Sequence, residues 1–126
     1  MGDSGSAHGQ LQRYLERGLK MQALAAAADM HTIGVEDALV LCLLLRDDPR
    51  YERAASRWHA KYVLEKGLPL AESRQLLSLL DLLATDDVPA AAAALALFLG
   101  RRGMRFAVAR LEELAAGVWP RSGGSA

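Results

Sequence analysis

The segment RWHAKY, residues 57–62, holds the densest group of chemically capable side chains in the chain. Two aromatic rings, a histidine and two cations follow one another there. A helix turns by about 100° per residue, so it would sort these groups onto different faces. One arc of about 60° holds Tyr51, Ala55, Trp58 and Tyr62. A second arc, centred about 130° away, holds Arg50, Arg53, Arg57 and Lys61.

The aromatic arc favours a structural role. Tyr51, Trp58 and Tyr62 supply the large rings that a core otherwise made of leucine and alanine needs. In the alternative interpretation the same rings line a ligand pocket or stack on a nucleobase, because Tyr and Trp each keep a polar group. We predict these three residues as core aromatics.

His59 lies at the edge of the aromatic arc, and the sequence offers it no chemical partner. A general base needs an orienting group and a nucleophile or substrate proton within reach. A metal site needs further ligands, but the other histidines, His8 and His31, stand far away in sequence, and neither HxxxH nor CxxC spacing occurs. We therefore predict a hydrogen-bonded histidine, no catalytic, metal-binding or cofactor-binding residues, and no enzymatic activity.

The four cations of the second arc, Arg50, Arg53, Arg57 and Lys61, are here called the basic face. A few such side chains can contact phosphates and give salt-sensitive binding of nucleic acid. They can equally meet an acidic protein, or simply form a solvated helix face. Basic and acidic residues balance at 15 each, so no global field favours nucleic acid, and we expect a protein partner before a nucleic acid.

A second basic cluster surrounds Gly103. It consists of Arg101, Arg102, Arg105 and Arg110. A helix–glycine–helix joint of this kind is where a DNA-binding interpretation would place its recognition helix. However, Glu112 and Glu113 follow on the last helix and would repel phosphate, so the pattern is a weak match.

The elements that must position these residues are all predicted to be helices, because no stretch alternates with period two. Expected helices cover residues 10–30, 35–45, 49–66, 68–83, 90–102 and 104–116. The second is apolar nearly all round and is expected at the centre. Asp48 is predicted to cap the third helix, with Pro49 in its first turn. The fold class is thus all-α, a compact bundle of about six helices.

Two of these segments resemble each other. GVEDALVLCLLLRDDP and LAESRQLLSLLDLLATDDVP share an acidic first turn, a leucine-dense body and an Asp-Asp stop before proline. One interpretation is a pair of pseudo-repeated helical hairpins. The other is that two buried helices, each followed by a capped helix, look alike for physical reasons alone. The domain organisation we expect is a disordered N-terminus (1–9), one helical domain (10–117) and a flexible C-terminal tail (118–126).

Composition narrows the setting. A hydrophobic fraction of 52% with 24% charged residues is typical of a globular protein. The lone cysteine, Cys42, excludes a disulfide framework, and residues 1–9 lack the features of a secretory signal, so we expect a cytoplasmic location. The leucine-rich apolar run, residues 38–45, is too short to span a membrane, and no membrane partner is expected. The bias toward Arg, Ala and Leu is what GC-rich codons produce, which favours a high-GC bacterial source.

These observations support two hypotheses about function. The first is a non-enzymatic helical protein–protein interaction module, an adaptor or regulator, with a homodimer as one form. Its basis is an excess of apolar helix, including the alanine run 90–94, over what one small core can bury. The alternative is a small nucleic-acid-binding regulator that uses the basic face.

Overall fold

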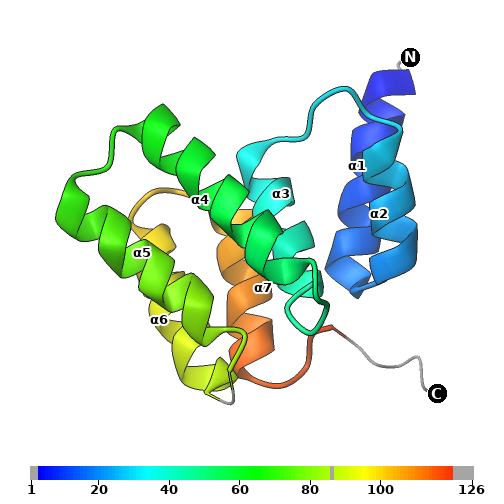
Figure 1. Ribbon diagram of the computed structural model, residues 1–126. Helices are drawn as coiled ribbons and strands as arrows, with labels where there is room; N and C mark the ends of the chain where they lie inside the picture. The colour runs from blue at the N-terminus through cyan, green and yellow to red at the C-terminus, as the bar shows by residue number, and fades with distance from the viewer. Residues whose placement is uncertain (1–2, 86, 121–126) are drawn as a thin grey trace.

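The computed structural model describes residues 3–85 and 87–120, and the regular secondary structure in this part of the chain is entirely α-helical. Figure 1 labels the helices. They are α1 (Asp3–Arg17), α2 (Lys20–Ala28), α3 (Val35–Leu44), α4 (Tyr51–Lys66), α5 (Leu70–Leu82), α6 (Val88–Gly100) and α7 (Arg105–Ala115). The prediction of an all-α helical bundle is confirmed.

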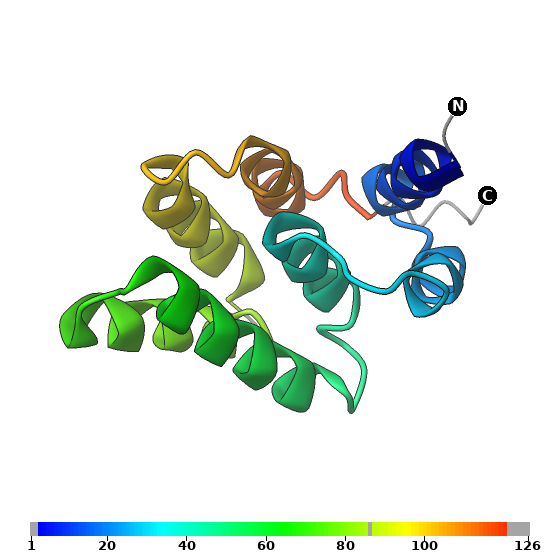
Figure 2. The same ribbon diagram turned by 90° about the horizontal axis from the view of Figure 1, so that it is seen from above.

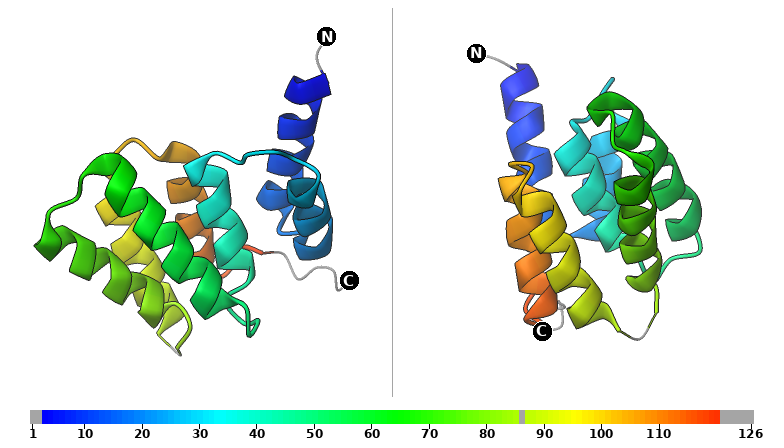
Figure 3. Two further views of the ribbon diagram at one scale, coloured as in Figure 1. Left: turned by 45° about the horizontal axis from the view of Figure 1, so that its top comes forward. Right: turned by 90° about the vertical axis from the view of Figure 1, so that its left-hand side faces the viewer.

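Helices α3 to α7 form a closed ring. Within the ring, α3 packs on α4, α5 packs on both α4 and α6, and α7 packs on α6 and returns to α3. Figure 2 shows α4 with α5 on one side, α6 with α7 on the other, and α3 between them. The hairpin of α1 and α2 packs against α3 at one end of the molecule (Figure 3). This topology leaves α6 at the periphery.

The first predicted helix, residues 10–30, is wrong as a single element. The chain breaks at Gly18, whose φ of 73° is left-handed and strained for any residue with a side chain. Leu19 N donates to Tyr14 O at 2.9 Å and Gly18 N to Leu15 O at 3.1 Å, the bonding pattern of a Schellman C-cap. Helix α1 also begins at Asp3, inside the segment expected to be disordered.

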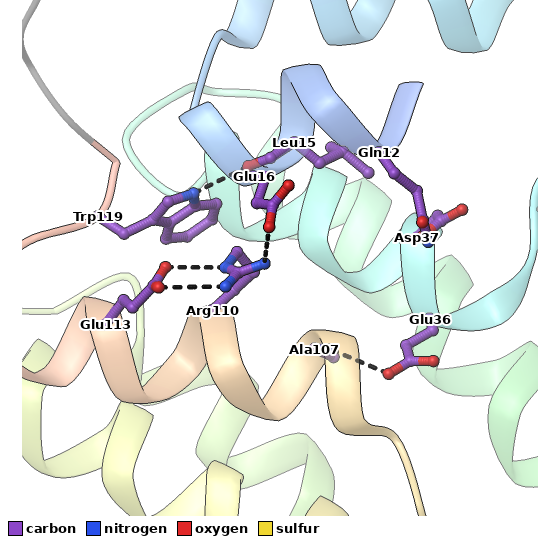
Figure 4. Close-up of polar contacts among 9 residues, drawn as sticks. All are labelled: Gln12, Leu15, Glu16, Glu36, Asp37, Ala107, Arg110, Glu113 and Trp119. Carbon is purple, nitrogen blue, oxygen red and sulfur yellow. Dashed lines mark hydrogen bonds and ion pairs between the residues drawn. The ribbon is translucent and has the colours of Figure 1, made fainter. Parts of the chain in front are cut away.

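The beginning of the C-terminal segment 118–126 also differs from the prediction of a flexible tail. The Trp119 side chain is only 3% exposed, and its indole Nε1 donates to Leu15 O in α1 at 2.8 Å (Figure 4). A buried indole needs such an acceptor, and Leu15 O, which also accepts from Gly18 N, has a second lone pair to offer. Residues 121–126 lie outside the described part of the chain.

Helix α3 is the central element that its composition indicated. Six of its ten residues are buried, and it packs against α1, α2, α4 and α7. Its cysteine, Cys42, is 6% exposed, and burial raises the pKa of the thiol to about 12. The pseudo-repeat stays a prediction. α3 pairs with α4 and α5 with α6, but α5 buries only Leu76 and Leu80 and lies on the outside.

The linker between α3 and α4 is organised by Asp48, although not as a helix cap at the predicted position. Helix α4 begins at Tyr51, and the Asp48 carboxylate accepts from the backbone N of Arg50 at 2.9 Å. The Arg50 guanidinium donates to both carboxylate oxygens, at 2.9 and 2.8 Å, and Lys20 Nζ lies 3.7 Å away. The bonds from Arg50 are the main reason that the pKa of Asp48 lies well below its ordinary value of 3.8.

This carboxylate predicts a pH dependence of folding. A pKa that is lower in the folded state gives a stabilisation that is complete above the ordinary value and lost as pH falls toward the folded one. We expect the stability advantage of the wild type over Asp48→Asn to be constant near neutral pH and to shrink from about pH 5 to about pH 2. Urea unfolding across this range measures it, with Asp47→Asn as the neighbouring control. An advantage that does not change with pH would contradict the account of Asp48.

Candidate interaction surfaces

The three aromatic side chains of α4 lie in the core rather than on a surface. Tyr51, Trp58 and Tyr62 are 4%, 5% and 0% exposed. Tyr51 Oη donates to Leu80 O, and Trp58 Nε1 donates to Val35 O at 2.8 Å. The rings of Trp58 and Tyr62 stack with centroids 4.9 Å apart. Two of the three polar groups therefore link α4 to neighbouring segments, and only the Tyr62 hydroxyl has no hydrogen-bond partner among the described residues.

His59 joins α4 to α5. Its Nε2 lies 2.8 Å from Ser73 O and 3.3 Å from Ser73 Oγ. A carbonyl oxygen only accepts, so Nε2 carries the proton and donates to Ser73 O. In this tautomer Nε2 does not accept the proton of the Ser73 hydroxyl, and the contact links the two helices. Sequence spacing gave no signal for Ser73, because the contact joins two helices.

The basic face is only partly free. Arg50 is held by Asp48, as described above, and Lys61 Nζ lies 3.9 Å from Glu65 Oε2. Arg53 and Arg57 are exposed and form no ion pair within residues 3–85 and 87–120. Two adjacent cations, one turn apart on α4, are what the face offers to a partner.

The structure does not bring the second basic cluster together as one patch. Arg101 and Arg105 are exposed, but Arg110 is 6% exposed and lies over the Phe106 ring at 5.0 Å. Its guanidinium donates to both Glu113 oxygens, at 2.8 and 3.1 Å, and lies 3.9 Å from Glu16 of α1 (Figure 4). Glu113, which had counted against phosphate binding, is thus a structural partner of Arg110.

Arg102 is also committed to the fold. Its guanidinium lies over the Phe98 ring at 4.3 Å, donates to Phe98 O at 3.1 Å and pairs with Glu72 of α5. Arg102 and Arg110 of the predicted cluster are therefore held by partners within the fold, while Arg101 and Arg105 remain exposed.

Two acidic residues of α3 act outside their own helix. Glu36 Oε2 accepts from Ala107 N at 3.0 Å, so it caps the first turn of α7 from across the bundle (Figure 4). Asp37, only 2% exposed, accepts from Gln12 Nε2 at 2.9 Å and lies 3.4 Å from His8 Nδ1. These contacts position α7 and α1 around α3.

An apolar groove lies between α6 and α7, and we call it the α6–α7 groove. Its volume is about 600 Å³, and Leu97 beside it is 74% exposed. Small side chains form most of the lining on α6, with Val108 and Ala115 contributed by α7. One cation, Arg101, and one anion, Glu112, also line the groove, and neither forms an ion pair within the described part of the chain.

A second groove, of about 560 Å³, separates α4 from α5 and is more polar, with Ser56, Ser78 and Asp81 in its wall. No group of histidine, cysteine, aspartate and glutamate that could hold a metal ion occurs among the described residues. None of the described helices combines the length and the apolar character needed to cross a membrane.

Comparisons with known protein families, curated proteins and solved structures found no match for this chain.

Proposed function

We propose that this protein is a non-enzymatic helical interaction module, an adaptor or regulator, whose α6–α7 groove binds a second copy of the same chain. The observation that carries the proposal is the outer face of α6. Residues 88–100 contain no polar side chain, yet Pro89, Ala90, Ala93 and Leu97 are exposed. An unpartnered apolar stripe of this kind is typical of an association surface.

The shape of the α6–α7 groove suits contact with the same surface of a second copy. Leu97 projects beside a hollow lined by Ala93, Ala96 and Gly100, so the side chain of one copy matches the hollow of another. Twofold symmetry places each such contact twice, which is the usual geometry of homodimers. Small residues on α6 also let the two backbones approach closely.

The charges that line the groove also suit contact with a second copy. Arg101 follows the end of α6 and Glu112 lies on α7, so each helix contributes one charge to the groove, and a twofold axis between two copies can set the Arg101 of one against the Glu112 of the other. Such pairs add specificity and orientation more than affinity. The basic face would then remain available to a second, acidic partner of the dimer.

Amide NMR spectra recorded over a dilution series test the location of this contact. On dilution, resonances from α6 and α7 should move together along one binding curve, while those of α4 should stay in place. Movement confined to α4 and α5 would place self-association elsewhere and overturn the proposal. Spectra that do not change with concentration would also contradict it.

The alternative, nucleic-acid binding, is supported by Arg53 and Arg57, which are exposed and unpaired among the described residues. If it holds, binding of mixed DNA or RNA should weaken steeply with salt, with a slope near two released counterions, and Arg53→Ala with Arg57→Ala should abolish it. Gel mobility at low salt measures this. Arg13→Ala with Arg17→Ala, on exposed positions of α1, is the matched control. If the wild-type protein does not change the mobility of the mixed DNA or RNA at low salt, the alternative is excluded.

The cellular setting is part of the proposal. The single cysteine, Cys42, is a free thiol, which favours a reducing compartment and, with the codon-biased composition, the cytoplasm of a high-GC bacterium.

A further inference from the structure

The hydroxyl of Tyr62 is an exception within the core. Tyr62 is fully buried, and its Oη is the one enclosed side-chain oxygen or nitrogen without a hydrogen-bond partner among the described residues. Buried hydroxyls are nearly always bonded, because leaving one unbonded carries the full cost of removing it from water. A partner from outside the protein, a water molecule or a ligand, would satisfy this hydroxyl.

Tyr62 forms part of the wall of a pocket at the corner between α4 and α5, here called the corner pocket. Its volume is about 320 Å³, at the lower end of the range for small-molecule sites. Lys66, Glu72 and Arg102 share the wall with Tyr62 and with the loop residues 67–69. Burial raises the pKa of Tyr62, while the charge of Arg102 lowers it by a smaller amount. The phenol is thus protonated at neutral pH and able to donate.

Arg102 is fixed in place and still has donors to offer. Its stacking on Phe98 and its bonds to Phe98 O and Glu72 hold the guanidinium plane in one orientation. These two hydrogen bonds use two of the five N–H groups, so three remain for a ligand. Its side chain is 26% exposed, which leaves it reachable from the pocket.

The first turn of α5 adds further donors. Pro69 occupies the N-cap position and no side chain caps the helix, so the first amide groups of α5 have no partner from a cap. The positive end of the helix dipole lies at the same corner. Lys66 contributes a second cation, and Glu72, paired with Arg102, is the only acidic residue in the wall.

We infer that the corner pocket binds a small molecule through an oxyanion, with Tyr62 Oη and the free N–H groups of Arg102 as its two main donors. A carboxylate and a phosphate share this chemistry, because each presents acceptor oxygens to a guanidinium and a hydroxyl. The site is separate from the α6–α7 groove, and its occupancy does not depend on self-association.

Titration of the full chain, followed by amide NMR, tests this site with two probes, inorganic phosphate and succinate, each at constant ionic strength. Saturable shifts at Gly67, Leu68 and Ala71 with either probe are the expected result, and the stronger probe identifies the class of oxyanion. Tyr62→Phe should weaken binding about tenfold, the usual loss for one hydrogen bond to a charged acceptor. Arg102→Lys should weaken it as well, because a lysine cannot offer the same fixed pair of donors.

The variant Tyr62→Phe breaks no hydrogen bond within the protein, so it should fold as the wild type does. Tyr51→Phe is the matched control, since it removes a hydroxyl from the same helix outside the pocket and should leave binding unchanged. The inference is overturned if neither probe gives saturable shifts at millimolar concentration. It is also overturned if Tyr62→Phe binds as well as the wild type, because water alone would then satisfy the hydroxyl.

Discussion

Replacing Trp119 by alanine is expected to lower the free energy of unfolding by about 3–5 kcal/mol, the usual cost of removing a large buried ring. The residue is 3% exposed, and its indole bonds to Leu15 O at 2.8 Å, so the substitution opens a cavity and removes one of the two donors to this carbonyl. The total free energy of unfolding of a domain of this size is about 5–15 kcal/mol, so the loss is a large share of it. Urea unfolding followed by circular dichroism measures it.

Two comparisons sharpen this result. Val118→Ala, at the neighbouring position that is 59% exposed, should change stability by less than about 0.5 kcal/mol. Trp119→Phe keeps most of the ring but removes the indole N–H. Its loss of stability should lie between those of Trp119→Ala and Val118→Ala. If Trp119→Ala unfolds within about 0.5 kcal/mol of the wild type, then residues 118–120 behave as the free tail that the sequence suggested, and the packing of α1 has another cause.

If two copies associate through the α6–α7 groove as proposed, replacing Leu97 by arginine is expected to convert the dimer into monomers. Burial of a leucine contributes about 1.5–3 kcal/mol, and twofold symmetry counts it twice, so the dimer should weaken by at least about 100-fold. The new charges would also be buried without partners in the groove. The fold itself should be unaffected, because Leu97 is 74% exposed in the single chain. Sedimentation velocity at matched concentrations measures the change.

The matched control is Leu64→Arg near the end of α4. Leu64 is 82% exposed and lies outside the α6–α7 groove, so this variant adds the same charge to an equally exposed leucine. It should self-associate as the wild type does. Equal weakening by both substitutions would show that general hydrophobic adhesion, and not the groove, holds the copies together.

Much of the fold could be predicted because it follows from local rules. Helical periodicity and the acidic first turns identified the helices, and the four-three-four spacing of Tyr51, Ala55, Trp58 and Tyr62 places these residues on the side of α4 that is buried. The all-round apolar character of residues 38–45 likewise indicated the centre. These signals depend on neighbours a few residues apart, which sequence displays directly.

The errors came from contacts between distant segments. Gly18 lies inside a good helical pattern, and only the packing of α1 and α2 against α3 shows why the chain turns there. Trp119 and Arg110 lie near charges and glycines that are typical of surfaces, yet both are buried and contact α1, through Leu15 and Glu16 respectively. No spacing rule could reveal partners 104 residues apart.

The candidate surfaces show the same limit. The composition of residues 88–100 predicts a helix that is buried on all sides. Sequence alone does not show that the ring of α3 to α7 leaves one side of this helix exposed to solvent. The corner pocket is harder still, because it depends on Tyr62, Glu72 and Arg102 meeting from three parts of the chain.

Sedimentation equilibrium of the wild-type protein over a range of concentrations tests the central claim most directly. The account predicts that the average mass rises with concentration from one chain to two and stops there, as a closed twofold contact requires. A mass that stays at one chain throughout would contradict self-association, and a mass that grows beyond two chains would contradict a closed contact through the α6–α7 groove.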